Sequence, residues 1–310
     1  MSQQIDTAYV DAYKSDIKVK FQQMTSRLRP FCQVETLAAE DTFMDRIGTV
    51  DPVEITSRHG DTPYIETPHD RRKISFRTFV WSDLIDKVDK LRMLADPSSP
   101  YSVNAIAGLQ RRMDDVVIEA ALGTAYTGKD GNVAVSSGWP VVAFDYTETI
   151  DATVTITPFA RNLNLGKLRR VKELLETAEA VSGENGERDL VVACHSSQLM
   201  SLLADARATS TDYAEVRALV HGEIKSYMGF KFVRTQRLKL KAGNVNVRRC
   251  VAFVSGSAIG LGLAEDPFVR VSELPAKNYS TQVYVRGSYG ATRMWEEQVV
   301  EIECDERYRG

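Results

Sequence analysis

The segment SVNAIAGLQRRMDDVVIEAALGTA, residues 102–125, carries the clearest helical pattern in the sequence. Its apolar residues recur at spacings of three and four, which places them on one face of a helix. This expected core face comprises Ile106, Leu109, Met113, Val116, Val117 and Ala120. Ser102 can cap the helix and Gly123 can help to end it. We expect a helix over 101–125, roughly 30–35 Å long.

The charged residues of this segment fall mostly on the opposite side of the helix. Asp114 and Asp115 are adjacent, as are Glu296 and Glu297 near the other end of the chain. Neither pair places two carboxylates at the spacing of three or four that one helix face or a metal site would need. We expect these carboxylates to be solvated or ion-paired.

Upstream of the helix, two stretches alternate with a period of two, which is typical of strands. They are VDPVEITSR at 50–58 and KISFRTFVW at 73–81. The turn-rich residues between them favour one long hairpin over 50–81. Few large apolar residues lie near its tip, and an isolated hairpin is only marginally stable in water. This hairpin therefore needs another surface to lie against.

The other elements follow from the same periodicities. Apolar spacing predicts an amphipathic helix over 5–28, which either packs on its own domain or docks on a partner. Further helices are expected over 82–95, with Ser82 as a possible cap, and over 164–182. Strands and helices alternate over 189–265, and the tail from 266 is rich in strands. The fold class is α+β.

Composition excludes several classes of protein. The 310 residues include 39 Lys plus Arg and 42 Asp plus Glu, for a net charge of −3, which argues against a dedicated nucleic-acid binder. The four cysteines form no CxxC pair, so we expect buried thiols in a reducing compartment rather than a zinc knuckle or a disulfide scaffold. The sequence offers neither a signal peptide nor a membrane-spanning apolar run, which indicates a soluble intracellular protein.

One stretch concentrates groups that could carry chemistry, namely SRHGDTPYIETPHDRRK at 57–73. A metal-dependent hydrolase using His59, Asp61 and His69 is one interpretation of this stretch, and the solvated tip of a hairpin is the other. Cys194 and His195 are neighbours on a predicted strand, so their side chains point to opposite faces and cannot act as nucleophile and base. The glycine-rich segments TGKDGN and GSAIGLG lack the order of a phosphate-binding loop.

The order of these elements resembles the major capsid protein of tailed bacteriophages, the Hong Kong 97-type fold. The local sequence also resembles that family in the segments NAIAGLQRRMDDVVIEAALGTA, RDLVVACHSSQLMSLLAD, GEIKSYMGFKFVRTQRL and QVYVRGSYGATRMWEEQVVEIECDE. The resemblance covers almost the whole chain. It implies an N-terminal arm at 1–49, an E-loop hairpin at 50–81, a P-domain at 82–188, an A-domain at 189–265 and, at 266–310, strands that return to the P-domain.

The resemblance implies a structural protein without catalytic residues, metal or cofactor. It places an intersubunit contact at the E-loop tip. The residues expected there are His59, Asp61, Tyr64, Glu66, His69, Asp70, Arg71, Arg72 and Lys73. We expect a deletion of 58–72 to leave a folded, soluble protein that cannot close shells. Lys73 and Asn278 are conceivable partners for a cross-link between subunits, although the sequence identifies no catalytic acid for it.

The same resemblance implies partners and a location. The chain would pair with itself in hexamers and pentamers of an icosahedral shell around double-stranded DNA, within a virion assembled in the bacterial cytoplasm. A separate scaffolding protein, a portal and a decoration or cement protein would join it, and no membrane is involved. Three alternatives remain open: an encapsulin-type nanocompartment shell, a tail-tube component, and the hydrolase that uses the His59 and His69 cluster.

Overall fold

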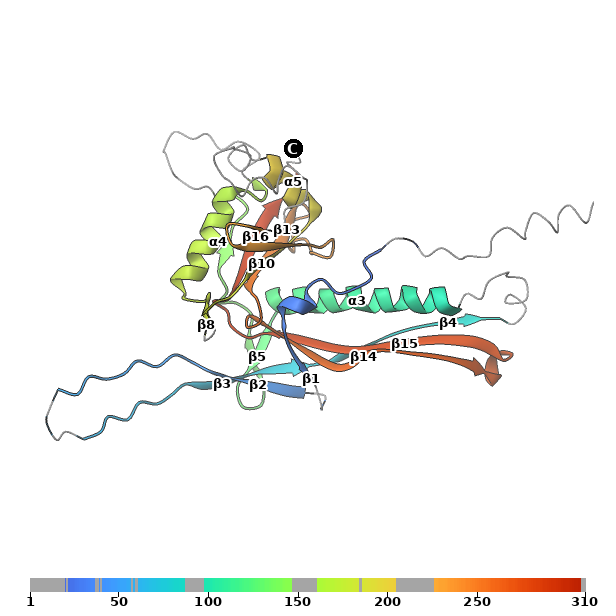
Figure 1. Cartoon of the computed structure of the whole chain (residues 1–310), viewed down its shortest axis with the longest axis horizontal. Coiled ribbons are helices and arrows are strands. Elements are labelled where there is room, and N and C mark those ends of the chain that lie inside the picture. The colour runs from blue at the N-terminus through green and yellow to red at the C-terminus, as the bar shows by residue number, and fades with distance from the viewer. Residues whose placement is uncertain are drawn as a thin grey trace, which may run out of the picture.

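The computed structural model of the chain describes residues 20, 22–36, 39, 41–56, 58, 61–86, 98–146, 161–183, 186–204 and 226–307. Figure 1 shows a compact unit built on a six-stranded sheet, beside a long helix that lies along a second sheet. A hairpin and the second sheet extend in opposite directions from the base of the compact unit. The molecule is therefore elongated, with two projections and one globular part.

The long helix α3 (Ser98–Leu122) packs along the sheet that we call the long sheet, ordered β1-β14-β15-β4. Its strands are β1 (Gln33–Thr36), β4 (Arg77–Ile85), β14 (Ile259–Leu274) and β15 (Ser280–Arg293). Leu109, Met113, Val116 and Val117 of the expected core face are buried, while Ile106 and Ala120 are half-buried. The predicted helix is confirmed in place and nearly in length.

The hairpin of β14 and β15 forms the two central strands of the long sheet. The two strands pair antiparallel from Ile259 opposite Arg293 to Leu274 opposite Ser280. A short 3-10 turn, Pro275–Lys277, joins them, followed by Asn278 and Tyr279 in the left-handed region with φ of 54° and 56°. Val283, Val285 and Tyr289 alternate on one face and are buried, which is the period-two pattern of a strand covered on one side.

The compact unit contains the six-stranded sheet, ordered β11-β12-β10-β13-β16-β7. Its strands are β7 (Val141–Val142), β10 (Leu190–Cys194), β11 (Ser226–Tyr227), β12 (Phe230–Arg234), β13 (Val247–Val254) and β16 (Val299–Asp305). Helices α4 (Leu165–Thr177) and α5 (Ser196–Ala204) flank it (Figure 1). β10 is a continuous apolar run, and every residue of β10 and β16 is buried, because both faces of the sheet are covered. All four cysteines are buried and free.

The smaller elements complete the described chain. A four-stranded sheet, ordered β2-β3-β5-β6, lies at the base of the projecting hairpin. Its strands are β2 (Asp41–Ile47), β3 (His69–Ser75), β5 (Ala125–Thr127) and β6 (Val133–Val135). The others are the two-stranded β8 (Ser182–Gly183) and β9 (Gly186–Glu187), and the 3-10 turn η2 (Arg29–Phe31). Among all the residues that the structure describes, no helix is long and apolar enough to cross a membrane.

Several predicted elements are wrong in position. The strand expected at 73–81 is divided at Phe76 between β3 and β4, which belong to different sheets. The helix expected from Ser82 is a strand as far as Ile85, because β4 pairs with β15 along that length. Residues 53–56 are extended but pair with no described strand, and the second helix ends at Thr177 rather than at 182. The last strand, β16, pairs with β13 in the six-stranded sheet.

The expectation of solvated carboxylates on α3 is wrong for Asp114. Its carboxylate is fully buried and accepts hydrogen bonds from the Ser26 hydroxyl at 2.6 Å and from the backbone N–H groups of Arg27 and Leu28 at 3.1 and 3.2 Å. These bonds hold residues 26–28 in a non-helical conformation, so the helix expected over 5–28 does not extend through 22–28. The rest of that prediction lies outside the described residues. Asp115 is ion-paired as expected, with Arg237 at 2.5 Å.

Candidate assembly surface

The hairpin arm consists of β2, β3 and the loop 48–68 between them. Figure 1 shows it extending away from both the compact unit and the long sheet. Among the described loop residues, Val50, Val53, Ile55, Tyr64 and Ile65 are exposed, and Tyr64 is 97% exposed. Exposed apolar side chains gathered on one extended segment mark an interaction surface. The arm is therefore a candidate interaction surface.

The residues expected at the arm tip separate into two groups. Asp61, Tyr64 and Glu66 lie on the loop and are exposed, while His59 lies outside the described residues. The placement of the others at the tip is wrong, because His69, Asp70, Arg71, Arg72 and Lys73 form β3 at the base of the arm. They pair there with β2, with His69 opposite Ile47 and Lys73 opposite Phe43. Sequence alternation alone could not fix this register, since charged residues fill both faces of β3.

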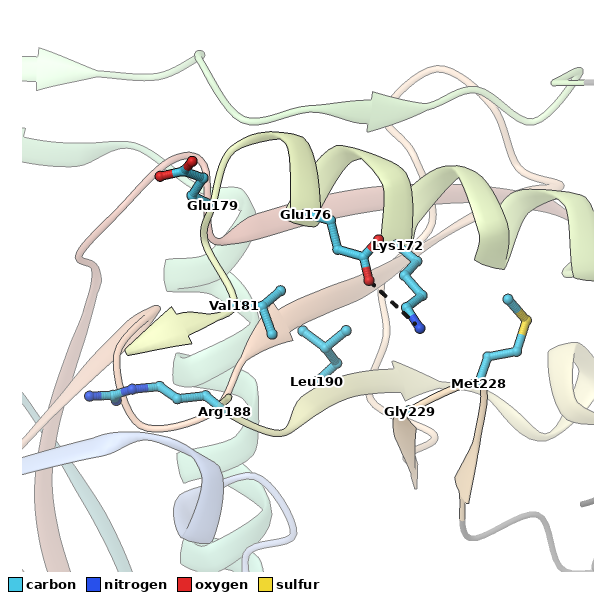
Figure 2. Close-up of a pocket in the computed structure, with 8 residues that line it drawn as sticks. All are labelled: Lys172, Glu176, Glu179, Val181, Arg188, Leu190, Met228 and Gly229. Carbon is cyan, nitrogen blue, oxygen red and sulfur yellow. Dashed lines mark ion pairs between the residues drawn. The ribbon is translucent and has the colours of Figure 1, made fainter. Parts of the chain in front are cut away.

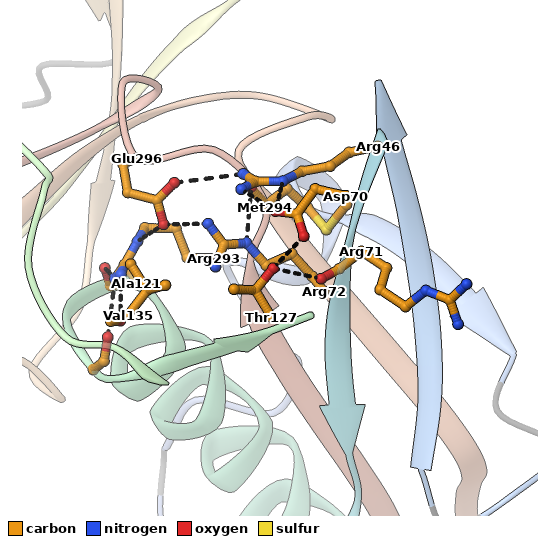
Figure 3. Close-up of polar contacts among 11 residues, drawn as sticks. Arg46, Asp70, Arg71, Arg72, Ala121, Thr127, Val135, Arg293, Met294 and Glu296 are labelled. Carbon is orange, nitrogen blue, oxygen red and sulfur yellow. Dashed lines mark hydrogen bonds and ion pairs between the residues drawn. The ribbon is translucent and has the colours of Figure 1, made fainter. Parts of the chain in front are cut away.

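Arg72 is buried inside the molecule rather than available at a tip. Its side chain is 1% exposed, and its guanidinium forms an ion pair with Glu296 at 2.5 Å (Figure 3). Burial lowers the pKa of the Arg72 guanidinium, and attraction to Glu296 opposes that shift. Glu296 was expected to be solvated or ion-paired, and its side chain is 14% exposed and ion-paired. Its partner lies 224 residues away in sequence.

Asp70 and Arg46 form a second ion pair across β2 and β3. Arg46 Nη2 lies 2.6 Å from Asp70 Oδ2, and Thr127 of β5 donates its hydroxyl to Asp70 Oδ1 at 2.5 Å. Partial burial would raise the pKa of Asp70, but the hydrogen bonds from Thr127 and Arg46 lower it to about 2. Arg46 also donates to the Met294 carbonyl at 2.6 Å and lies 3.4 Å from Glu296. No local sequence pattern identifies Arg46 as part of this cluster, because it is a single arginine within β2.

Arg293, at the end of β15, ties the arm base to the end of α3. It is fully buried and donates hydrogen bonds to the carbonyls of Ala121 at 2.9 Å and Gly123 at 3.0 Å. Its Nε lies 3.6 Å from Glu296, and its guanidinium stacks over the Trp139 ring at 4.1 Å from the centroid. Cations at a helix C-terminus satisfy carbonyl groups that lack a partner within the helix. Arg293 is thus held firmly on the body side of the arm base.

The arm crosses the long sheet at a glycine. A Cβ on Gly290 of β15 would lie 2.4 Å from the Ser75 carbonyl oxygen and 3.0 Å from Ile74 Cγ2 of β3. A carbon cannot approach backbone that closely, so this position requires glycine. Around the crossing, Met44, Ile74 and Met294 form a small buried apolar cluster. β3 therefore rests directly on the backbone of β15.

A second exposed apolar surface lies on the long sheet. Val80 and Leu84 of β4, Phe268 and Val271 of β14, and Tyr279 beside their turn are all exposed. Val80 of β4 and Phe268 of β14 lie on one face of the sheet, on either side of Arg286 in β15, because both pair with that residue. Val271 pairs with Val283 and therefore lies on the opposite face. In Figure 1 this end of the long sheet points away from the arm. The two exposed apolar surfaces are thus on opposite projections of the molecule.

The other chemical candidates do not form an active site. Cys194 is buried in β10, and its pKa is raised to about 12 by burial. His195 Nδ1 lies 3.0 Å from the Ser197 hydroxyl, which itself donates to Glu306 at 2.6 Å, so the serine is committed to the start of α5. No cluster of three His, Cys, Asp or Glu side chains within the described ranges could hold a metal ion. Lys73 is ion-paired with Asp41 at 2.8 Å.

The compact unit also carries a cavity of about 520 Å³ beside α4 (Figure 2). Val181, Leu190 and Met228 contribute its apolar lining, and Lys172 and Glu176 form an ion pair of 3.7 Å at its side. Glu179 and Arg188 complete a rim of both charges. Such a mixed rim selects neither anions nor cations, so the cavity identifies no ligand class.

Comparisons with known proteins identify a family model that matches nearly the whole chain and solved structures with a similar fold. A family model described as phage capsid protein matches residues 5–306. The fold is similar to the capsid of cyanophage P-SCSP1u, with a TM-score of 0.68, 14% identity and coverage of 97% of this chain and 94% of that one. It is also similar to the capsid of cyanophage Pam1 (TM-score 0.68, 14% identity, 95% of each chain). The capsid of the native GTA particle has a TM-score of 0.67 and 13% identity over 98% of each chain. A search of curated proteins finds no match.

Proposed function

The chain belongs to the phage capsid protein family, and from this premise we propose that the arm of one copy lies across the long sheet of an adjacent copy in a closed shell. The family membership and the capsid-type fold confirm a structural, non-enzymatic major capsid role in a virion, in which copies of the chain assemble with one another. The nanocompartment and hydrolase alternatives receive no support from these comparisons.

The observation that carries the proposal is the exposure of the loop 48–68. Its apolar side chains, led by Tyr64, are exposed, and no described part of the chain covers this projecting loop. The exposed surface on the long sheet, around Val80 and Phe268, is the complementary apolar area and points the opposite way. An arm that binds a different surface on the next copy makes a head-to-tail contact, and such contacts form rings when the rotation closes. Weak contacts then stabilise a shell by their number.

The loop residues have distinct parts in this proposal. Tyr64 is the anchor, because aromatic side chains bury large areas at low entropic cost. Asp61 and Glu66 lie at the rim, where charged pairs fix register more than affinity. The E-loop, P-domain and A-domain of the capsid family correspond in this proposal to the arm, the long sheet with α3, and the compact unit.

The test replaces residues 50–66 by a short Gly-Ser turn. The deletion of 58–72 expected from the sequence would also remove most of β3, so it would confuse a folding defect with an assembly defect. We expect the replacement to leave a folded monomer that forms no closed particles in electron micrographs. Closed particles of normal size from this variant would contradict the proposal.

A point variant sharpens the same test. Tyr64→Ser removes the anchor, and Tyr64→Phe is the matched control that keeps the ring. We expect particle yield to fall for the serine variant and to stay near that of the natural chain for phenylalanine. Equal yields for all three chains would assign the anchoring role to another residue.

The remaining partners belong to the same proposal. We expect hexamers and pentamers in an icosahedral shell around double-stranded DNA, assembled in the bacterial cytoplasm with a separate scaffolding protein, a portal and a decoration or cement protein. The net charge of −3 supports a wall that does not adhere strongly to packaged DNA. Nuclease-protected DNA in purified particles and co-purified scaffold would test these partners. Protected contents that are protein alone would favour a nanocompartment instead.

A further inference from the structure

The arm has little apolar support where it joins the body. Besides its pairing with β2, β3 pairs with β5 only through Arg72 and Lys73. The apolar cluster beneath it contains Met44, Ile74 and Met294 as its buried members. A two-stranded hairpin is marginally stable by itself, so a further interaction must fix its direction relative to the body.

One carboxylate joins both strands of the arm to the body. Glu296 receives Arg72 of β3 at 2.5 Å, Arg46 of β2 at 3.4 Å and Arg293 at 3.6 Å (Figure 3). Both arm arginines also donate to the Met294 carbonyl, at 2.6 Å from Arg46 and 3.4 Å from Arg72. The segment 294–296 therefore holds the arm from both strands at once.

The charges make Glu296 difficult to replace. Three guanidinium groups, from Arg46, Arg72 and Arg293, share Glu296 and Asp70 as their carboxylates. Arg72 and Arg293 are 1% and 0% exposed, so without Glu296 their charges would be buried and repel each other. Arg293 cannot retreat, because its hydrogen bonds to Ala121 and Gly123 fix it on α3. The repulsion between the two guanidinium groups would therefore displace Arg72, and β3 with it.

We infer that Glu296 is a positioning residue that locks the direction in which the arm leaves the body, through its ion pairs with Arg72 and Arg46. This inference rests on the proposed function only in its consequence for the shell. The lock itself is a property of the single chain. Assembly then requires Glu296 although Glu296 lies in no proposed contact between copies.

The experiment compares Glu296→Gln with Glu297→Gln by hydrogen exchange on unassembled protein. Glu297 is the matched control, because it is the same residue type one position along and is exposed. We expect Glu296→Gln to speed exchange in peptides from β2 and β3 by at least about tenfold, with the six-stranded sheet unchanged. Exchange in β2 and β3 equal to that of the Glu297 control would overturn the inference.

A double-mutant cycle separates the ion pair from a general folding defect. Arg72→Gln combined with Glu296→Gln removes both members of this ion pair, so the double variant no longer leaves Arg72 as a buried charge without its carboxylate. We expect arm exchange in the double variant to be no faster than in Glu296→Gln alone. If the increase in exchange rate in the double variant equals the product of the increases in the two single variants, the two residues act independently. That result would overturn the inference even if Glu296→Gln proves poorly folded.

Particles report the consequence for assembly. We expect Glu296→Gln to give fewer closed particles, with a wider spread of diameters than Glu297→Gln. If the 50–66 replacement assembles normally while the exchange results hold, the arm contact proposed above fails and the lock stands. If the replacement prevents assembly while arm exchange in Glu296→Gln is unchanged, the arm contact stands and the lock fails.

Discussion

The compact unit and the hairpin arm are stabilised by different forces. The six-stranded sheet buries large apolar side chains, with Phe230, Phe253 and Val299 almost fully inaccessible. The arm exposes its apolar residues and is attached to the body by charged side chains, with Arg72 and Glu296 at the centre. Burial is non-directional and tolerates small shifts, whereas a buried ion pair depends on geometry. The compact unit therefore supplies stability, and the ion pairs at the arm base are inferred to set the direction in which the arm leaves the body.

The largest expected effect is on the compact unit. Phe230→Ala removes a fully buried ring from β12 and should lower the free energy of unfolding by about 3–5 kcal/mol. Urea denaturation of the unassembled protein measures it. The control is Val245→Ala, since Val245 is 80% exposed in the same unit and should change stability by less than about 0.5 kcal/mol. Similar losses for both variants would mean that the sheet is not the main source of stability.

The second effect concerns the attachment of residues 26–28 to α3. Asp114→Ala leaves the buried Ser26 hydroxyl and the backbone N–H of Leu28 without their acceptor, and should cost about 1–3 kcal/mol. Denaturation and hydrogen exchange around 26–32 check the size and the place of the loss. Asp130→Ala, at an exposed loop position, is the control. A loss spread evenly over the chain would contradict a local anchor.

Acid should weaken both regions within the same window. Hydrogen bonds, acting against partial burial, lower the pKa of Asp70 in the arm and of Glu306 in the compact unit to about 2. Because the folded pKa values lie below the unfolded ones, the stabilisation is present above about pH 4–4.5 and is lost as the pH falls towards 2. Melting temperature against pH measures this slope. Glu306→Gln should flatten it, and an unchanged slope would remove Glu306 from the explanation.

The smallest effect on the single chain should come from the arm tip. Tyr64→Ser removes a side chain that is 97% exposed and should change the free energy of unfolding by less than about 0.5 kcal/mol. The same variant is expected to reduce particle yield, so stability and assembly would separate. A clear loss of monomer stability would show that Tyr64 packs within its own chain.

Sequence patterns predicted those elements whose stability comes from apolar burial. The spacing of Leu109, Met113 and Val117 predicted α3, and the apolar run at 190–194 predicted β10. The arm strands were misplaced because β2 and β3 contain charged residues that are buried only through distant partners. No local pattern links Arg72 to Glu296, or Asp114 to the backbone at 27–28. Asp61, Tyr64 and Glu66 lie exposed on the predicted loop, because turn-forming residues mark loops locally, and their part in a contact stays a prediction.

The glycine crossing at Gly290 gives the arm the geometry of a lever. From Ser75 at the crossing to the middle of the loop is about seventeen residues, which at roughly 3.3 Å each is an arm of at most roughly 55 Å. A rotation of about 5° about the crossing would move the tip by up to about 5 Å, more than the length of a hydrogen bond. A side chain at position 290 would push β3 away from β15 and impose such a rotation. In the proposed assembly, the angular tolerance of the whole shell thus depends on a position where only a hydrogen atom fits.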